Sequence, residues 1–206
     1  MSVPLVFVIG DSISMHYGPY LEKMLWPRWA YARKTGREAA LKAAQDANGG
    51  DSSAVLSYVE AMAADEAWRP GLLLLNCGLH DTRGDPKTGA KQVPLERYCQ
   101  NLRMIVRIVG QIRVPMIWIR ITPVHEQRQK SLAKEFLRFA ADVEAYNAAA
   151  DEIMTEAEAP ILDLHGFTAA LEGEIFCDHV HFTEPVRRLQ AAFIAGCVQA
   201  FFALRG

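Results

Sequence analysis

A serine, an aspartate and a histidine stand in two short polar motifs that could together hydrolyse an ester. Ser12 ends the tripeptide Gly-Asp-Ser, directly after an apolar run, and Asp178 and His181 share a later Asp-His-Val-His motif. A serine hydroxyl becomes a nucleophile when a base within hydrogen-bond distance takes its proton. An imidazole suits this task near neutral pH, and it needs an acceptor on its second nitrogen. We therefore predict that Ser12 is the nucleophile, His181 its base and Asp178 the orienting acid.

The Gly-Asp-Ser tripeptide alone does not distinguish a nucleophile from a turn, because Asp and Ser are also good N-caps of helices. Its position relative to the other polar motifs favours the nucleophile. Similar motifs stand near the ends of other apolar runs or before the last helix: NGGDSS at 48–53, NCGLHD at 76–81, TPVH at 122–125 and CDHVHF at 177–182. In open α/β sheets, ligands bind at the carboxyl ends of the strands. One active site at this edge explains the five motifs better than five coincidences.

The negative oxygen formed when a serine attacks an ester needs fixed hydrogen-bond donors. We assign this oxyanion hole to the backbone N–H groups of Ser12 and Gly50 and to a ring N–H of His80. Glycine at position 50 lets the backbone approach the substrate closely. Gly49 is the alternative to Gly50 as the second donor.

The elements that would position these residues alternate along the chain. Short apolar runs predict buried strands at 5–9, 72–75, 115–121 and 160–164, and a further strand is expected between 37 and 47, where the composition supports it least. Helical spacing predicts helices at 20–25 (continuing one that follows Ser12), 53–64, 95–112, 131–156 and 185–204. Residues 84–89 are the most loop-like segment. This alternation predicts a single α/β domain over 1–206, with a parallel sheet.

Composition excludes several classes of function. The 206 residues are half hydrophobic with a net charge of −2 and no basic cluster, so we expect no nucleic-acid partner. No segment has the roughly 18 uninterrupted apolar residues of a membrane span, and the N-terminus lacks the pattern of a signal peptide. The four cysteines are far apart and form no CxxC pair, so we expect a cytoplasmic protein without a zinc site or disulfides. The sequence does not indicate an oligomeric state.

Three motifs in this order resemble those of the SGNH hydrolases, also called GDSL-type esterases and lipases. They are Gly-Asp-Ser-Ile at 10–13, Asn-Gly-Gly-Asp-Ser at 48–52 and Asp-His-Val-His at 178–181. The third family block normally reads Gly-x-Asn-Asp, whereas this chain has Gly-Leu-His-Asp at 78–81, so His80 occupies the asparagine position. The resemblance implies a flavodoxin-like three-layer α/β/α sandwich with about five parallel strands. It also implies ester or thioester hydrolysis without a metal or other cofactor.

The sequence thus predicts a carboxylic ester hydrolase that acts through an acyl-enzyme, and we favour an O-acetyl ester of a carbohydrate or small molecule as substrate. Acyl chain length and thioester preference remain open. One alternative is a metal-dependent, phosphoesterase-like hydrolase. Its candidate ligands are Asp11, His80, Asp81, Asp178, His179 and His181. The other alternative is a binding protein of the same fold that lost turnover through the change at His80.

Overall fold

The apolar runs form the centre of a parallel sheet. The computed structural model describes residues 3–34, 47–132 and 135–204. Within them, the predicted runs become β1 (Leu5–Ile9), β3 (Leu72–Leu75), β4 (Met116–Ile119) and β5 (Ile161–Leu162). The sheet has five strands in the order β2-β1-β3-β4-β5, and every neighbouring pair is parallel. The predicted α/β fold class is therefore confirmed.

The second strand, β2 (Ala30–Arg33), lies earlier in the chain than predicted. The expected stretch, 37–47, lies outside the described residues except for Ala47. β2 pairs with β1 at the edge of the sheet, and all four of its residues are half-buried. An edge strand that is not covered on both faces does not need a continuous apolar run, which is why the sequence Ala-Tyr-Ala-Arg gave no strand signal.

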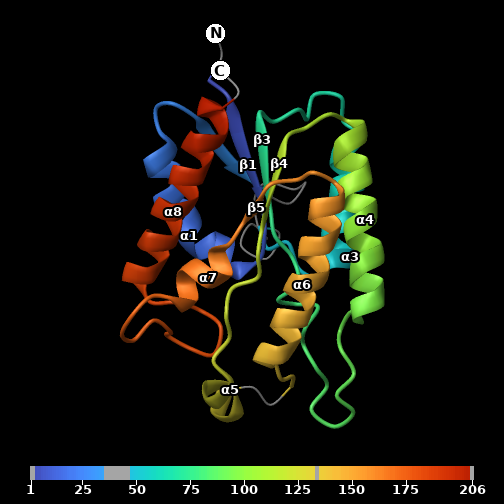
Figure 1. The fold of residues 1–206 in the computed structure, drawn as a ribbon, viewed down its shortest axis with the longest axis vertical. Coiled ribbons are helices and arrows are strands. Elements are labelled where there is room, and N and C mark those ends of the chain that lie inside the picture. The colour runs from blue at the N-terminus through green and yellow to red at the C-terminus, as the bar shows by residue number, and fades with distance from the viewer. Residues whose placement is uncertain (1–2, 35–46, 133–134, 205–206) are drawn as a thin grey trace.

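Helices cover both faces of the sheet (Figure 1). On one face lie α1 (Ser12–Leu25), α7 (Leu164–Ala169) and α8 (Glu184–Ala203), and on the other lie α3 (Ser52–Ala63), α4 (Leu95–Gln111) and α6 (Ala140–Glu156). α8 packs along α1, and α4 packs between α3 and α6. None of the helices within the described ranges is both long and apolar enough to cross a membrane.

The single helix predicted over 131–156 is confirmed for 140–156, which form α6, but it is wrong as one continuous helix, because α5 (Glu126–Leu132) ends before α6 begins. Between the two helices, the backbone of Leu137 exchanges two hydrogen bonds with Gly84, of 2.7 and 2.9 Å. Gly84 opens the predicted loop 84–89. A backbone that pairs with a distant loop cannot also complete helical hydrogen bonds, so the helix stops there although its composition is rich in alanine.

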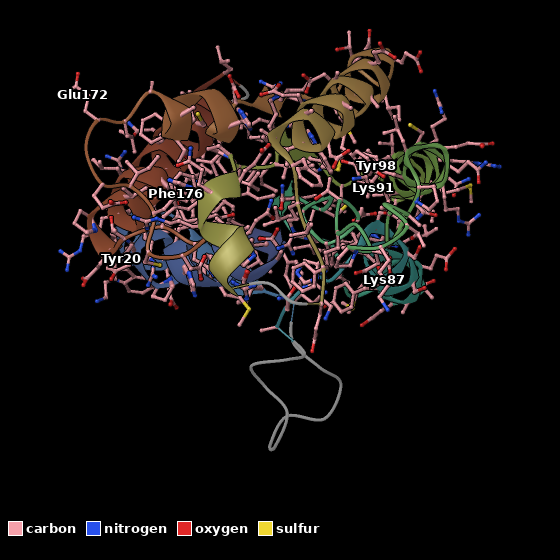
Figure 2. The ribbon with its side chains drawn as sticks, turned by 90° about the horizontal axis from the view of Figure 1, so that it is seen from below. Tyr20, Lys87, Lys91, Tyr98, Glu172 and Phe176 are labelled. Atoms are coloured by element: carbon pink, nitrogen blue, oxygen red, sulfur yellow. The ribbon has the colours of Figure 1, made fainter. Side chains whose placement is uncertain are left out.

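Two aspartates start the helices that follow the polar motifs. Asp11 caps α1 by accepting a 2.9 Å hydrogen bond from the Ile13 N–H. Asp51 caps α3 by accepting hydrogen bonds from the N–H groups of Ser53 and Ala54. Each cap places a helix N-terminus at the carboxyl edge of the sheet. Figure 2 looks onto this edge and shows α5 in front of it, with Phe176 beside α5.

Candidate active site

The three residues predicted as nucleophile, base and acid form one hydrogen-bonded chain. Oγ of Ser12 lies 2.8 Å from Nε2 of His181, and Nδ1 of the same ring lies 2.6 Å from Oδ2 of Asp178. An ionised carboxylate only accepts hydrogen bonds, so Nδ1 carries the proton and Nε2 presents its lone pair to the Ser12 hydroxyl. All three side chains are partly exposed to solvent. The arrangement lets His181 take the serine proton while a substrate approaches from solvent.

A single turn of the loop before α8 positions both the acid and the base. Oδ1 of Asp178 accepts hydrogen bonds of 2.8 and 2.7 Å from the N–H groups of Val180 and His181. The turn is closed by a 2.9 Å hydrogen bond from the Cys177 N–H to the His181 carbonyl. One carboxylate oxygen therefore holds the backbone while the other holds the ring. This is the curled-back geometry that the three-residue spacing predicts.

The same contacts keep Asp178 ionised. Partial burial by itself would raise the pKa of this carboxyl. The hydrogen bonds from the Val180 and His181 amides, and the contact with the His181 ring, outweigh burial and lower the pKa to about 2. Asp178 is consequently an anion throughout the range in which a histidine base operates.

Gly50 stands beside the nucleophile turn, but its N–H has a partner. The Gly50 backbone has a φ of +75°, and its N–H donates to Oδ1 of Asn48 at 2.9 Å. The Gly49 N–H donates to the Gly10 carbonyl at 2.9 Å, which joins the second polar motif to the first. An oxyanion role for Gly50 therefore requires its N–H to leave the Asn48 oxygen, and it stays a prediction.

His80 follows β3 in the turn of 78–81, and its ring makes no hydrogen bond within the described ranges. Burial lowers the pKa of His80 to about 3, and the positive charges of Arg83 and Arg138 add to the effect. The neighbouring Asp81 is fully buried and directs both carboxylate oxygens to the Ser52 N–H, at 3.0 and 2.9 Å. Asp81 thus fastens the start of α3, and His80 is neutral at neutral pH.

Two further residues, His16 and Arg138, lie near the site, and neither position was predicted from the sequence. The His16 ring lies 4.8 Å from the His181 ring, centroid to centroid, and burial lowers the pKa of His16 to about 4. His16 stands four residues after Ser12, and this helical spacing could have placed both on one face of α1. Arg138 donates to Nε2 of His179 at 3.2 Å, and no sequence signal joins these two residues.

The candidate ligands of the metal alternative do not form a metal site within the described ranges. Among the described residues, no group of three His, Cys, Asp or Glu side chains could hold a metal ion. Asp11 caps α1, Asp81 binds the start of α3, and Asp178 binds His181. The ligand set that the sequence suggested is therefore divided among separate structural contacts.

Comparison with known proteins agrees with this architecture. The model of the GDSL-like Lipase/Acylhydrolase family matches residues 8–189. Three similar solved structures are a lipase/acylhydrolase from Enterococcus faecalis, the psychrotrophic esterase EstA from Pseudoalteromonas sp., inhibited by monoethylphosphonate, and Axe2, an acetylxylan esterase from Geobacillus stearothermophilus. Their identities are 15%, 13% and 16%, with TM-scores of 0.73, 0.67 and 0.65. The alignments cover 96%, 97% and 94% of this chain, and 96%, 99% and 93% of the others. No curated protein sequence matches the chain.

Proposed function

Because this chain belongs to the GDSL-like lipase/acylhydrolase family, the SGNH hydrolases, we propose that it is a serine esterase that cleaves carboxylic esters through an acyl-enzyme. The observation that carries the proposal is the hydrogen-bonded chain from Ser12 through His181 to Asp178, with contacts of 2.8 and 2.6 Å. A nucleophile bonded to a base, and a base oriented by a third group, is the arrangement that serine catalysis needs.

The proposed reaction has two halves. In the first, Oγ of Ser12 attacks the ester carbonyl carbon while Nε2 of His181 takes the hydroxyl proton. The tetrahedral intermediate collapses when His181 returns that proton to the departing alcohol oxygen, which leaves the acyl group on Ser12. In the second half, His181 takes a proton from water, and the hydroxide attacks the acyl carbon. The acid is released as the proton returns to Ser12.

Three donors are proposed for the oxyanion. The Ser12 N–H belongs to the first turn of α1, where backbone N–H groups have no partner within the helix. The Gly50 N–H and a ring N–H of His80 supply the others. The positive end of the α1 dipole favours negative charge at the same place.

An O-acetyl ester of a carbohydrate or a small molecule is the proposed substrate. The Geobacillus neighbour is an acetylxylan esterase, and a second structural neighbour is also an acetyl xylan esterase, with a TM-score of 0.69 at 12% identity. These structural similarities support the fold of this chain directly, and they support an acetyl group in its substrate by analogy.

The test is a series of 4-nitrophenyl esters with acetyl, butyryl and decanoyl groups, measured with and without a chelator. We expect kcat/KM to fall by about tenfold or more from the acetyl to the decanoyl ester, because a site for a small acyl group rejects a long chain. We expect the chelator to leave the rate unchanged. A higher kcat/KM for the decanoyl ester would contradict the acetyl assignment, and loss of activity with the chelator would favour the metal-dependent alternative.

His80 should act as a neutral donor, and the pH dependence tests this. With a pKa of about 3, the His80 ring is charged only well below the working range, so it neither gains nor loses a proton between about pH 5 and 9. We therefore expect kcat/KM to rise in a single step as the base loses its proton, with no descending limb from His80. A narrow bell that His80→Asn converts to a single rise would show that the donor is cationic.

Substitution of His80 gives the magnitude of its contribution. His80→Ala removes the donor and should lower kcat on the order of 10²-fold with little change in KM. His80→Asn restores an N–H at nearly the same place and should retain far more activity. If both variants are equally impaired, or if the alanine variant matches wild type, His80 has a structural role only.

A further inference from the structure

Two arginines face the same aromatic ring beside the proposed active site. The guanidinium carbon of Arg83 lies 4.5 Å from the centroid of the Phe136 ring, and that of Arg138 lies 4.8 Å from it. We call Arg83 and Arg138 the arginine pair. Two like charges in one place repel each other, and the ring face compensates only part of this cost.

No acidic side chain of the described residues forms an ion pair with the arginine pair. Among the described residues, the ion pairs of arginine involve Arg120, Arg128 and Arg188, and neither member of the pair has a carboxylate within 4 Å. Arg138 is only 3% exposed. The nearest acids that act on it through space are Asp11 and Asp178, both already engaged elsewhere. Buried charge is costly when it lacks an ion-pair partner, and within the described ranges neither arginine has one, so this arrangement favours a ligand that brings negative charge.

The arginine pair is attached to the residues that flank the proposed catalytic groups. Nε of Arg138 donates to the Leu79 carbonyl at 2.6 Å, and its Nη1 donates to Nε2 of His179 at 3.2 Å. The backbone N–H of Arg83 donates to the His80 carbonyl at 3.2 Å. The pair therefore adjoins the turn that carries His80 and the turn that carries Asp178.

A purely structural role accounts for Arg138 better than for Arg83. The hydrogen bonds of Arg138 hold two loops together, as buried arginines often do. The Arg83 side chain makes no hydrogen bond with the described residues, and its Nε is buried without a partner. Its guanidinium therefore has N–H donors without a partner among the described residues, and the Phe136 ring holds it beside the turn that carries His80.

From these contacts we infer that the arginine pair binds an anionic group, a carboxylate or a phosphate, of the ester substrate. Guanidinium groups recognise both anions through paired N–H···O hydrogen bonds. The inference rests on the proposed function and narrows its substrate class. Since an acetyl group is neutral, the negative charge belongs to the alcohol part. The inferred substrates are therefore acetyl esters of alcohols that carry a carboxylate or phosphate group, for example an acetylated acidic sugar.

The experiment compares three aryl acetates that differ in charge: 4-acetoxybenzoate, 4-acetoxyphenyl phosphate and the neutral 4-acetoxybenzamide. The measured quantity is the ratio of kcat/KM for each anionic ester to that for the amide. Wild type should prefer at least one anion by about tenfold or more, because charge-assisted hydrogen bonds exceed neutral ones. The two anionic arms identify whether carboxylate or phosphate is preferred. A wild-type ratio near one for both anions would overturn the inference.

Variants of Arg83 then test whether this residue causes the preference for anionic esters. Arg83→Gln should bring the ratio close to one, and Arg83→Lys should retain a clearly larger ratio because it keeps the charge. The matched control is Arg97→Gln, which removes an exposed arginine on α4. It should leave kcat/KM for every ester, and the ratio of anionic to neutral ester, unchanged. A preference that survives Arg83→Gln, or that falls equally in both Arg83 variants, would contradict the assignment.

Binding separates this inference from the proposed function. Calorimetry with the Ser12→Ala protein gives Kd for the same three esters without turnover. If wild type hydrolyses none of them, the proposed function fails, but tighter binding of an anionic ester still supports the arginine pair. If wild type hydrolyses all of them and binding shows no preference for charge, the esterase stands and the inference is wrong.

Discussion

Replacing Ser12 with alanine should lower kcat for ester hydrolysis by a factor on the order of 10⁴ or more. The Ser12 hydroxyl is the proposed nucleophile. Because the members of a catalytic triad act as a unit, loss of one member removes nearly the whole contribution of the triad to kcat. The hydrogen bond of Oγ is to His181, and the Ser12 side chain is not part of the buried core. Folding should therefore be unaffected. The measurements are kcat with 4-nitrophenyl acetate and the free energy of unfolding in urea.

The control for Ser12→Ala is Ser57→Ala, which removes an exposed hydroxyl on α3. It should keep both the activity and the stability of wild type. Covalent labelling adds a second measurement: a serine-directed phosphonate should modify wild type at Ser12 and leave the Ser12→Ala protein unmodified. Retention of more than about a tenth of wild-type kcat by Ser12→Ala would rule out the serine mechanism, since even one general-base contribution is worth about 10²-fold.

Asp178→Asn should lower kcat by a factor on the order of 10³ to 10⁴. In wild type, the carboxylate accepts the Nδ1 proton of His181 and so leaves Nε2 free to act as a base. The amide of asparagine presents N–H donors to the same ring, which favours the opposite tautomer with its proton facing Ser12. The remaining amide oxygen can still accept from the Val180 and His181 amides, so the loop should keep its conformation.

Asp163→Asn is the matched control for this variant. Asp163 also stands in a loop at the start of a helix, and its side chain accepts a 2.8 Å hydrogen bond from the Gly166 N–H. It lies outside the proposed site, so the variant should keep wild-type kcat even if stability falls. Equal activity in Asp178→Asn and wild type would show that another group orients His181.

The sequence predicted the centre of the sheet well because those strands are buried on both faces. The bounds of β1 and β3 agree residue for residue with their apolar runs, since burial on both faces requires apolar residues at every position. β2 was misplaced because its half-buried residues need no such pattern. The break before α6 was missed because it depends on the pairing of Leu137 with Gly84, more than fifty residues earlier in the chain.

In the candidate site too, features set by short sequence motifs could be predicted, and features set by side-chain conformation or tertiary packing could not. The contacts of Ser12, His181 and Asp178 could be predicted because each residue stands in a short motif whose place in the chain fixes its place at the sheet edge. The contact of Gly50 with Asn48 was not predicted, because it depends on a local side-chain conformation. The arginine pair was not predicted either, because Arg83 and Arg138 meet on Phe136 only through tertiary packing. The motifs predicted the proposed reacting groups, whereas the candidate determinants of specificity became visible only in the packing around them.

The hydrogen bond between Gly50 and Asn48 bears on when the proposed oxyanion hole is used. A neutral ester carbonyl is no better an acceptor than the amide oxygen of Asn48, so a bound substrate gains little by taking the Gly50 N–H from it. The negative oxygen of the tetrahedral intermediate is a much stronger acceptor, and it can take the donor. In the proposed mechanism, this exchange of partners stabilises the transition state and not the ground state. Binding energy of this kind raises kcat without lowering KM, so the donor contributes only as the bond to Ser12 forms.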